Sequence, residues 1–143
     1  LEVAARAAEA VFLGFLVVTL VAFVLREERV TGDTLMGGIC AYLLIGLFFV
    51  AVLSVVELLA PGSLVQGGRP LSELPQGPGG RIQGLVYFSF VTLTTLGYGD
   101  ITPASELTRV LAPLEAVIGQ LYVAVLIAHL VGLHLAGSAR RDG

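Results

Sequence analysis

Apolar residues along this chain fall into three long runs separated by polar stretches. The first, residues 7–25, is apolar except for Glu9 and Thr19 and has about 19 residues, close to the minimum for a membrane-spanning helix. The second, residues 35–60, would form a helix of about 39 Å, which exceeds the hydrocarbon core and predicts a tilted span. The third, residues 104–136, would form about 50 Å of helix.

The first run leaves an alternative open, because its length is marginal and it contains Glu9. A helix of this kind could span the bilayer or lie in its interface. We favour the spanning helix.

Polar and helix-breaking residues predict where these helices begin and end. Pro61 and Gly62 end the second helix, and Glu57 near that end is expected to extend its carboxylate to the membrane interface. Either Thr102 or Ser105 is expected to cap the third helix. Pro113 is expected to bend that helix. In the second run, Cys40 is interpreted as a small packing residue.

The stretch between the second and third runs has two parts, one rich in proline and glycine and one with apolar residues at helical spacing. Residues 61–80 hold four prolines and six glycines and predict an aqueous loop without a core of its own. Residues 81–94 are too short to span, yet Leu85, Phe88 and Val91 recur at helical spacing and predict a re-entrant half-helix. Its C-terminal end would carry partial negative charge that suits a cation.

Residues 92–100 follow this half-helix and form neither a good helix nor a convincing strand. Irregular backbone is costly in a membrane unless it lines a wet cavity or is buried in protein. A polar, glycine-bearing segment in these surroundings therefore predicts a functional site.

Composition narrows the class of protein. The chain has 143 residues, of which 56% are hydrophobic and 13% charged, more apolar surface than a water-soluble domain of this size could bury. Its mean hydropathy is +0.92. The net charge of −3 argues against a nucleic-acid partner. No metal-ligand cluster or Ser/His/Asp set is placed to converge, so an enzyme is disfavoured.

Residues 95–100 read Thr-Leu-Gly-Tyr-Gly-Asp, which resembles the Thr-Val-Gly-Tyr-Gly selectivity filter of potassium channels. The resemblance extends more weakly over residues 81–137 and is to a bacterial-type, two-helix pore module. It implies an all-α membrane protein with a potassium-channel-like pore and one additional N-terminal helix, assembled as a tetramer. Residues 1–33 would form that helix and a cytoplasmic turn, and residues 34–143 the ion-channel pore domain. The pore domain would comprise an outer helix 35–60, a turret 61–80, a pore helix 81–94, a filter segment 95–99 and an inner helix 104–136.

The resemblance implies passive, potassium-selective conduction by a homotetramer, in which each chain joins three identical subunits in the lipid bilayer. Potassium would be the permeant ion, with no other cofactor. The ion-binding residues would be those of the filter segment, which supply backbone carbonyls, the threonine hydroxyl or glycine flexibility: Thr95, Leu96, Gly97, Tyr98 and Gly99. A weakly selective cation channel is an alternative, because Leu96 replaces valine and Phe88 cannot donate a hydrogen bond. The membrane subunit of a potassium uptake transporter is less favoured, since only one filter copy is present.

The resemblance also assigns residues around the filter segment. Thr94, Asp100 and Tyr87 would support it, and Tyr98 would point outward toward the pore helix. The cavity and gating residues would follow one face of the inner helix: Gly119, Gln120, Val123, Ile127 and Val131.

Two residues of the inner helix have further interpretations. Gly119 is either a hinge or a site of close helix packing. Glu115 is expected to meet a polar partner behind the filter segment.

Orientation follows from the same resemblance. The turret would be extracellular or periplasmic, and the turn after the first helix and the C-terminus would be cytoplasmic, in a cell membrane. Four arginines would then lie inside, Arg26, Arg29, Arg140 and Arg141, against Arg69 and Arg81 outside. If the first helix spans, the chain would begin outside, which an upstream helix missing from this chain would explain; a gating domain could be missing as well.

Overall fold

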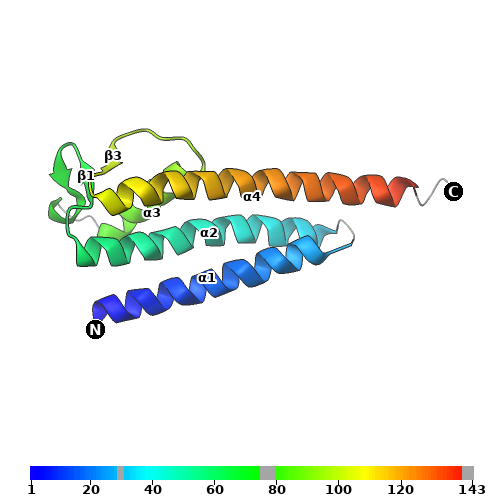
Figure 1. Cartoon of the computed structure of the whole chain (residues 1–143), viewed down its shortest axis with the longest axis horizontal. Helices are drawn as coiled ribbons and strands as arrows, with labels where there is room; N and C mark the ends of the chain where they lie inside the picture. The colour runs from blue at the N-terminus through cyan, green and yellow to red at the C-terminus, as the bar shows by residue number, and fades with distance from the viewer. Residues whose placement is uncertain (29–30, 75–79, 140–143) are drawn as a thin grey trace.

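Three long helices lie side by side in the computed structural model, which describes residues 1–28, 31–74 and 80–139 (Figure 1). They are α1 (Glu2–Arg26), α2 (Gly32–Leu59) and α4 (Glu106–Ala139). A shorter helix, α3 (Gly80–Leu93), packs against α2 and α4 near one end of the bundle. The remaining elements gather at that end: β1 (Leu64–Gln66), β2 (Arg69–Pro70), the 3₁₀ turn η1 (Leu71–Glu73) and β3 (Ile101–Pro103).

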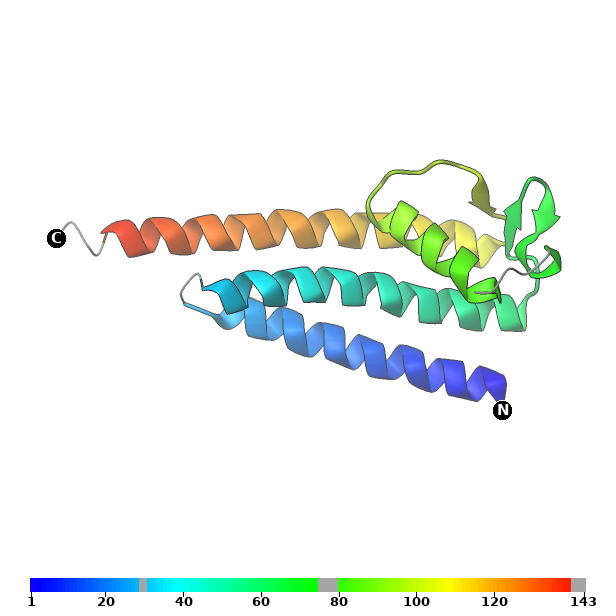
Figure 2. The same cartoon turned by 180° about the vertical axis from the view of Figure 1, so that it is seen from behind.

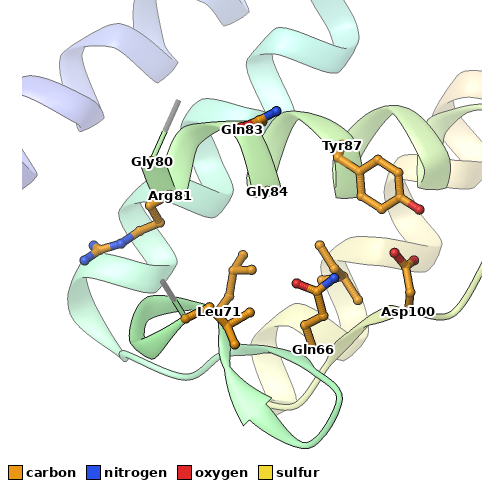
Figure 3. Close-up of a pocket in the computed structure, with 10 residues that line it drawn as sticks. Gln66, Leu71, Gly80, Arg81, Gln83, Gly84, Tyr87 and Asp100 are labelled. Carbon is orange, nitrogen blue, oxygen red and sulfur yellow. The ribbon is translucent and has the colours of Figure 1, made fainter. Parts of the chain in front are cut away.

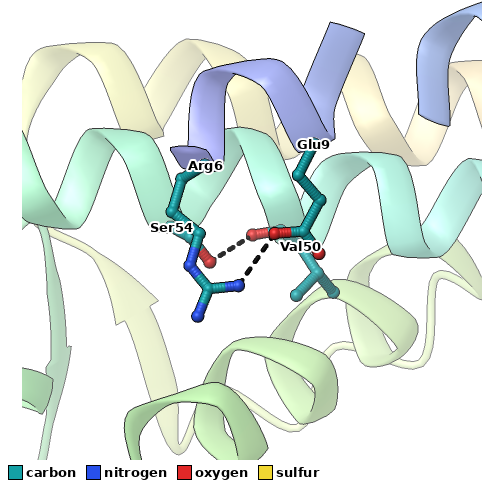
Figure 4. Close-up of polar contacts among 4 residues, drawn as sticks. All are labelled: Arg6, Glu9, Val50 and Ser54. Carbon is teal, nitrogen blue, oxygen red and sulfur yellow. Dashed lines mark hydrogen bonds and ion pairs between the residues drawn. The ribbon is translucent and has the colours of Figure 1, made fainter. Parts of the chain in front are cut away.

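Among the described residues, three helices are long and apolar enough to cross a membrane, and they are the three that the apolar runs predict. Helix α1 has 25 residues, more than the apolar run alone. It begins at Glu2 and includes the polar residues Arg6 and Glu9, which lie one turn apart and form an ion pair of 2.8 Å (Figure 4). Helix α1 is long and apolar enough to span a bilayer, and the choice between a spanning and an interfacial helix stays a prediction.

Helices α2 and α4 are both capped at their N-termini by side-chain hydroxyl groups. Thr31 and Thr34 form a reciprocal capping box at the start of α2. At α4, the Ser105 hydroxyl accepts from the Thr108 amide at 3.2 Å, so Ser105 is the cap, whereas Thr102 lies in β3. Helix α4 continues through Pro113.

Glu57 does not extend to the membrane interface, so that prediction is wrong. Its side chain is only 1% exposed and accepts backbone hydrogen bonds from Gly62 at 3.3 Å and Leu64 at 2.5 Å. These amides lie just beyond the end of α2, the Leu64 amide in a buried and the Gly62 amide in a partly buried position. Glu57 thus fixes the path of the chain as it leaves α2.

We expect Glu57→Gln to destabilise the protein by about 1–3 kcal/mol, because glutamine keeps one acceptor oxygen and turns an N–H group toward a backbone amide. Thermal unfolding in detergent measures this. Glu73→Gln is the matched control, since Glu73 is exposed. Equal unfolding temperatures for the two variants would contradict the assigned role of Glu57.

The described part of the turret is more ordered than its composition predicts. Strands β1, β2 and β3 form an antiparallel sheet in the order β2-β1-β3, in which Val65 lies opposite both Pro70 and Thr102. Leu64 and Leu71 are buried in the main hydrophobic core. Residues 61–74, the described part of the loop, cover the core formed by α2, α3 and α4. The sequence did not predict this, because isolated leucines among glycines show no helical or strand periodicity.

The same loop joins the neighbouring ends of α2 and α4. The Ser63 carbonyl accepts from the amides of Ala104 at 2.8 Å and Ser105 at 3.3 Å, and from the Thr108 hydroxyl at 2.9 Å. One backbone oxygen therefore connects the exit of α2 to the first turn of α4.

Cys40 is exposed in the single chain, which fits contact with lipid or another subunit, so its interpretation as a packing residue stays a prediction. The buried residues at this end of α2 include Thr34, Gly38 and Ala41, which lie on a different face of the helix. In an all-apolar helix the sequence does not reveal which face packs inward.

The N-terminus lies at the end of the bundle that carries the strands, and the end of α1, the start of α2 and the last turns of α4 lie at the opposite end (Figure 2). The side of a membrane that each end of the bundle would face stays a prediction. The arginines at 29, 140 and 141, which enter the predicted charge bias, lie outside the described residues.

Candidate functional site

Helix α3 is held in place by contacts on two of its faces. Leu85 and Phe88 are buried in the main core. Phe90 rests on Gly46 of α2, where an added Cβ would lie 2.9 Å from the phenyl ring. Ser89 is 3.0 Å from the Gly46 carbonyl. The absence of a side chain at Gly46 therefore lets α3 approach α2 closely.

The filter segment, residues 95–99, begins as a direct extension of α3. Backbone amides of Leu96 and Gly97 both bond to the Val91 carbonyl, at 2.9 and 3.2 Å, and the Thr95 amide bonds to Thr92 at 2.9 Å. These bonds satisfy carbonyls that the end of a helix leaves free. Thr94 is fixed by its hydroxyl, which donates to the Phe90 carbonyl at 2.6 Å.

Backbone handedness alternates along the filter segment. Positive φ occurs at every second residue, with 58° at Thr95, 57° at Gly97 and 78° at Gly99. A segment that turns consecutive carbonyls to one side requires such an alternation. Glycine adopts these angles freely, whereas Thr95 adopts one at a cost of about 1–3 kcal/mol, which its bonds to α3 must offset.

Aromatic and carboxylate side chains flank the outer part of the segment. The Tyr98 ring stacks on Tyr87 of α3, with centroids 6.5 Å apart and planes 4° apart, so Tyr98 faces α3 as predicted. The Tyr87 hydroxyl and the Asp100 carboxylate face each other at the edge of a cleft (Figure 3). Desolvation, then the hydrogen bond and negative charge of Asp100, raise the pKa of the Tyr87 phenol above its ordinary value. Their role in supporting the filter segment stays a prediction.

Gly119 lies against the last residue of α3. A Cβ at this position would be 2.6 Å from the Leu93 carbonyl oxygen and 2.8 Å from the Leu93 side chain. This contact favours the close-packing interpretation of Gly119. A hinge at the same residue stays a prediction.

Glu115 has the polar partner that the sequence predicts. Its side chain is fully buried, and its Oε1 is 2.5 Å from the Ser89 hydroxyl on α3. The interaction joins α4 to the helix that leads into the filter segment.

The predicted cavity residues lie along the unpartnered side of α4. Gln120, Ile127 and Val131 are exposed in the single chain and Val123 is half-buried. Exposure in one chain fits a central cavity as well as contact with lipid or another subunit, so their role stays a prediction.

Two tyrosines near the filter segment were not identified from the sequence. Tyr42 donates to the Leu93 carbonyl at 3.4 Å, and Tyr122 donates to the Gly38 carbonyl at 2.7 Å. Their rings stack with centroids 6.2 Å apart. The sequence did offer a signal for them: each tyrosine lies within an apolar run, and a tyrosine hydroxyl buried there needs a hydrogen-bond partner.

Comparison with known proteins identifies similar chains. Residues 77–133 match a family described as "Ion channel". Two pore potassium channel c of Oryza sativa subsp. japonica is 33% identical over 91 residues, covering 64% of this chain and 17% of that protein. The chain thus spans less than a fifth of that relative's length. No solved structure matches it significantly.

Proposed function

We propose that the chain is one subunit of a potassium-selective channel, because residues 77–133 match the ion channel family. The family match and the relative support the resemblance to potassium channel pore domains. The observation that carries the proposal is the alternating backbone of residues 95–99, attached to a short helix between two membrane helices.

Conduction would depend on replacing the water around the ion. A potassium ion entering a narrow pore loses hydration oxygens, and the carbonyls of Thr95, Leu96, Gly97 and Tyr98, with the Thr95 hydroxyl, would replace them. The C-terminal end of α3 carries partial negative charge and would stabilise the cation below the filter segment. The protein supplies fixed dipoles, and the electrochemical gradient drives transport.

A complete ring of oxygens requires several copies of this segment, and we propose four. In the single chain, Leu96 is 55% and Tyr98 67% exposed, although both are large and apolar. Neighbouring subunits would cover these side chains and bring four filter segments around one axis. The turret would face outside and the C-terminus the cytoplasm of a multi-pass protein in the cell membrane.

A weakly selective cation channel is the second candidate. Phe88 is buried in the core and offers no hydrogen bond, so Tyr98 is braced by stacking on Tyr87. Stacking fixes the position of a ring less strictly than a hydrogen bond does, which would allow the oxygen rings to widen.

Reconstitution in liposomes separates the two candidates. Under a potassium gradient we expect potassium flux, and under an equal sodium gradient much less. Equal flux of the two ions would rule out the selective channel and favour the weakly selective one. Native mass measurement of the detergent-solubilised protein tests the tetramer, which a monomer or dimer would contradict.

A further inference from the structure

Three buried oxygen atoms form a chain behind the filter segment, and each comes from a different helix. The Ser89 hydroxyl of α3 lies in the middle, 3.0 Å from the Gly46 carbonyl of α2 and 2.5 Å from Glu115 Oε1 of α4. Ser89 and Glu115 are both fully buried.

The number of protons in this chain of oxygens is determined by chemistry. Two oxygen–oxygen contacts of hydrogen-bond length need one proton each. The Gly46 carbonyl has none and the Ser89 hydroxyl supplies one. The second proton can come only from the Glu115 carboxyl group.

We propose that Glu115 is protonated and donates to Ser89, which donates to the Gly46 carbonyl, so that a neutral relay positions α3 behind the filter segment. The functional part of this inference rests on the proposed channel. Glu115 is a positioning residue here, since it does not contact the permeant ion.

The surroundings of Glu115 agree with a neutral side chain. Its second oxygen, Oε2, is buried without a hydrogen-bond partner among the described residues. The ion pair that those residues form is Arg6–Glu9, which does not involve Glu115. An ionised carboxylate would therefore be buried with one donor and no counter-charge, whereas a neutral acid leaves only a weak carbonyl acceptor unsatisfied.

The relay is in register with a second contact between α3 and α4. Ser89 meets Glu115, and four residues later on both helices Leu93 meets Gly119. One turn of each helix separates the two contacts. Together they fix the position of α3 along the axis of α4 and the rotation of α3 about its own axis. Because Leu93 ends α3, the relay sets where residues 95–99 begin.

Infrared spectroscopy of the reconstituted protein at neutral pH tests the proton directly. We expect a C=O stretch of a protonated carboxylic acid that disappears in Glu115→Gln and persists in Glu73→Gln, which alters an exposed carboxylate. Loss instead of an ionised-carboxylate band in Glu115→Gln would overturn the assignment of the proton.

The positioning role is tested by potassium and sodium flux in the same samples. Glu115→Gln should keep the potassium-to-sodium flux ratio, since its amide can still donate to Ser89. Glu115→Leu, similar in size but without a donor, should lower the ratio by about tenfold. An unchanged ratio in Glu115→Leu would overturn the positioning role. If the wild-type protein conducts neither ion, the proposed channel fails, while the infrared difference still decides where the proton lies.

Discussion

Replacing Gly97 by alanine is expected to abolish potassium flux without unfolding the protein. At a φ of 57°, alanine is disfavoured by roughly 1–2 kcal/mol, so the backbone would relax toward negative φ. That rotation turns a carbonyl away from the ion path in every subunit. Removing a ring of oxygens leaves the ion partly dehydrated without compensation, which raises the barrier for every ion that passes.

Gly67 offers a matched control for this change. Its φ is 59°, and an added Cβ at either glycine would meet nothing within 4 Å of the single chain. Gly67→Ala should therefore cost similar stability while leaving liposome flux near the wild-type level. Flux in Gly97→Ala that equals flux in Gly67→Ala would show that residues 95–99 do not select the ion.

Gly119→Ala should reduce both stability and selectivity. The added Cβ would lie 2.6 Å from the Leu93 carbonyl, a backbone atom that cannot rotate away, so α3 and α4 must separate. Overpacking of this kind costs about 1–3 kcal/mol. Because Leu93 immediately precedes the filter segment, the displacement should also disturb residues 95–99 and lower the potassium-to-sodium flux ratio.

Gly132→Ala is the control, since Gly132 lies on the same helix with nothing within 4 Å. That variant should be at least as stable as the wild type, because alanine favours helix over glycine by about 1 kcal/mol. The measurements are thermal unfolding in detergent and ion flux in liposomes. If both alanine variants unfold at the same temperature and select equally well, close packing at Gly119 is wrong and the hinge becomes the better interpretation.

The long helices could be predicted because each property that defines them is local. Apolar runs mark α1, α2 and α4, and the leucine and phenylalanine spacing marks α3 although that helix is short. Positive φ at residues 97 and 99 was also predictable, because glycine adopts it freely, whereas nothing in its residue type marks Thr95 for positive φ.

Contacts between distant residues were harder to predict. Glu57 looked like a surface carboxylate because the amides that it binds become partners only when the chain folds back after Pro61. Ser89 and Gly46 are 43 positions apart, and neither differs locally from other small residues in apolar helices. Glu115 was the exception, since a carboxylate deep in an apolar run requires a partner whatever the fold.

The Ser63 carbonyl, which binds the first turn of α4, makes the two ends of that helix mechanically unequal. Toward the other end, the Tyr122 hydroxyl bonds to Gly38 at 2.7 Å, and α4 then continues to Ala139 for about 26 Å. A helix clamped at its beginning and supported along one side behaves as a cantilever, whose displacement grows with distance from the clamp. Force applied near the C-terminus would therefore move that end most and leave the neighbourhood of residues 95–99 nearly still.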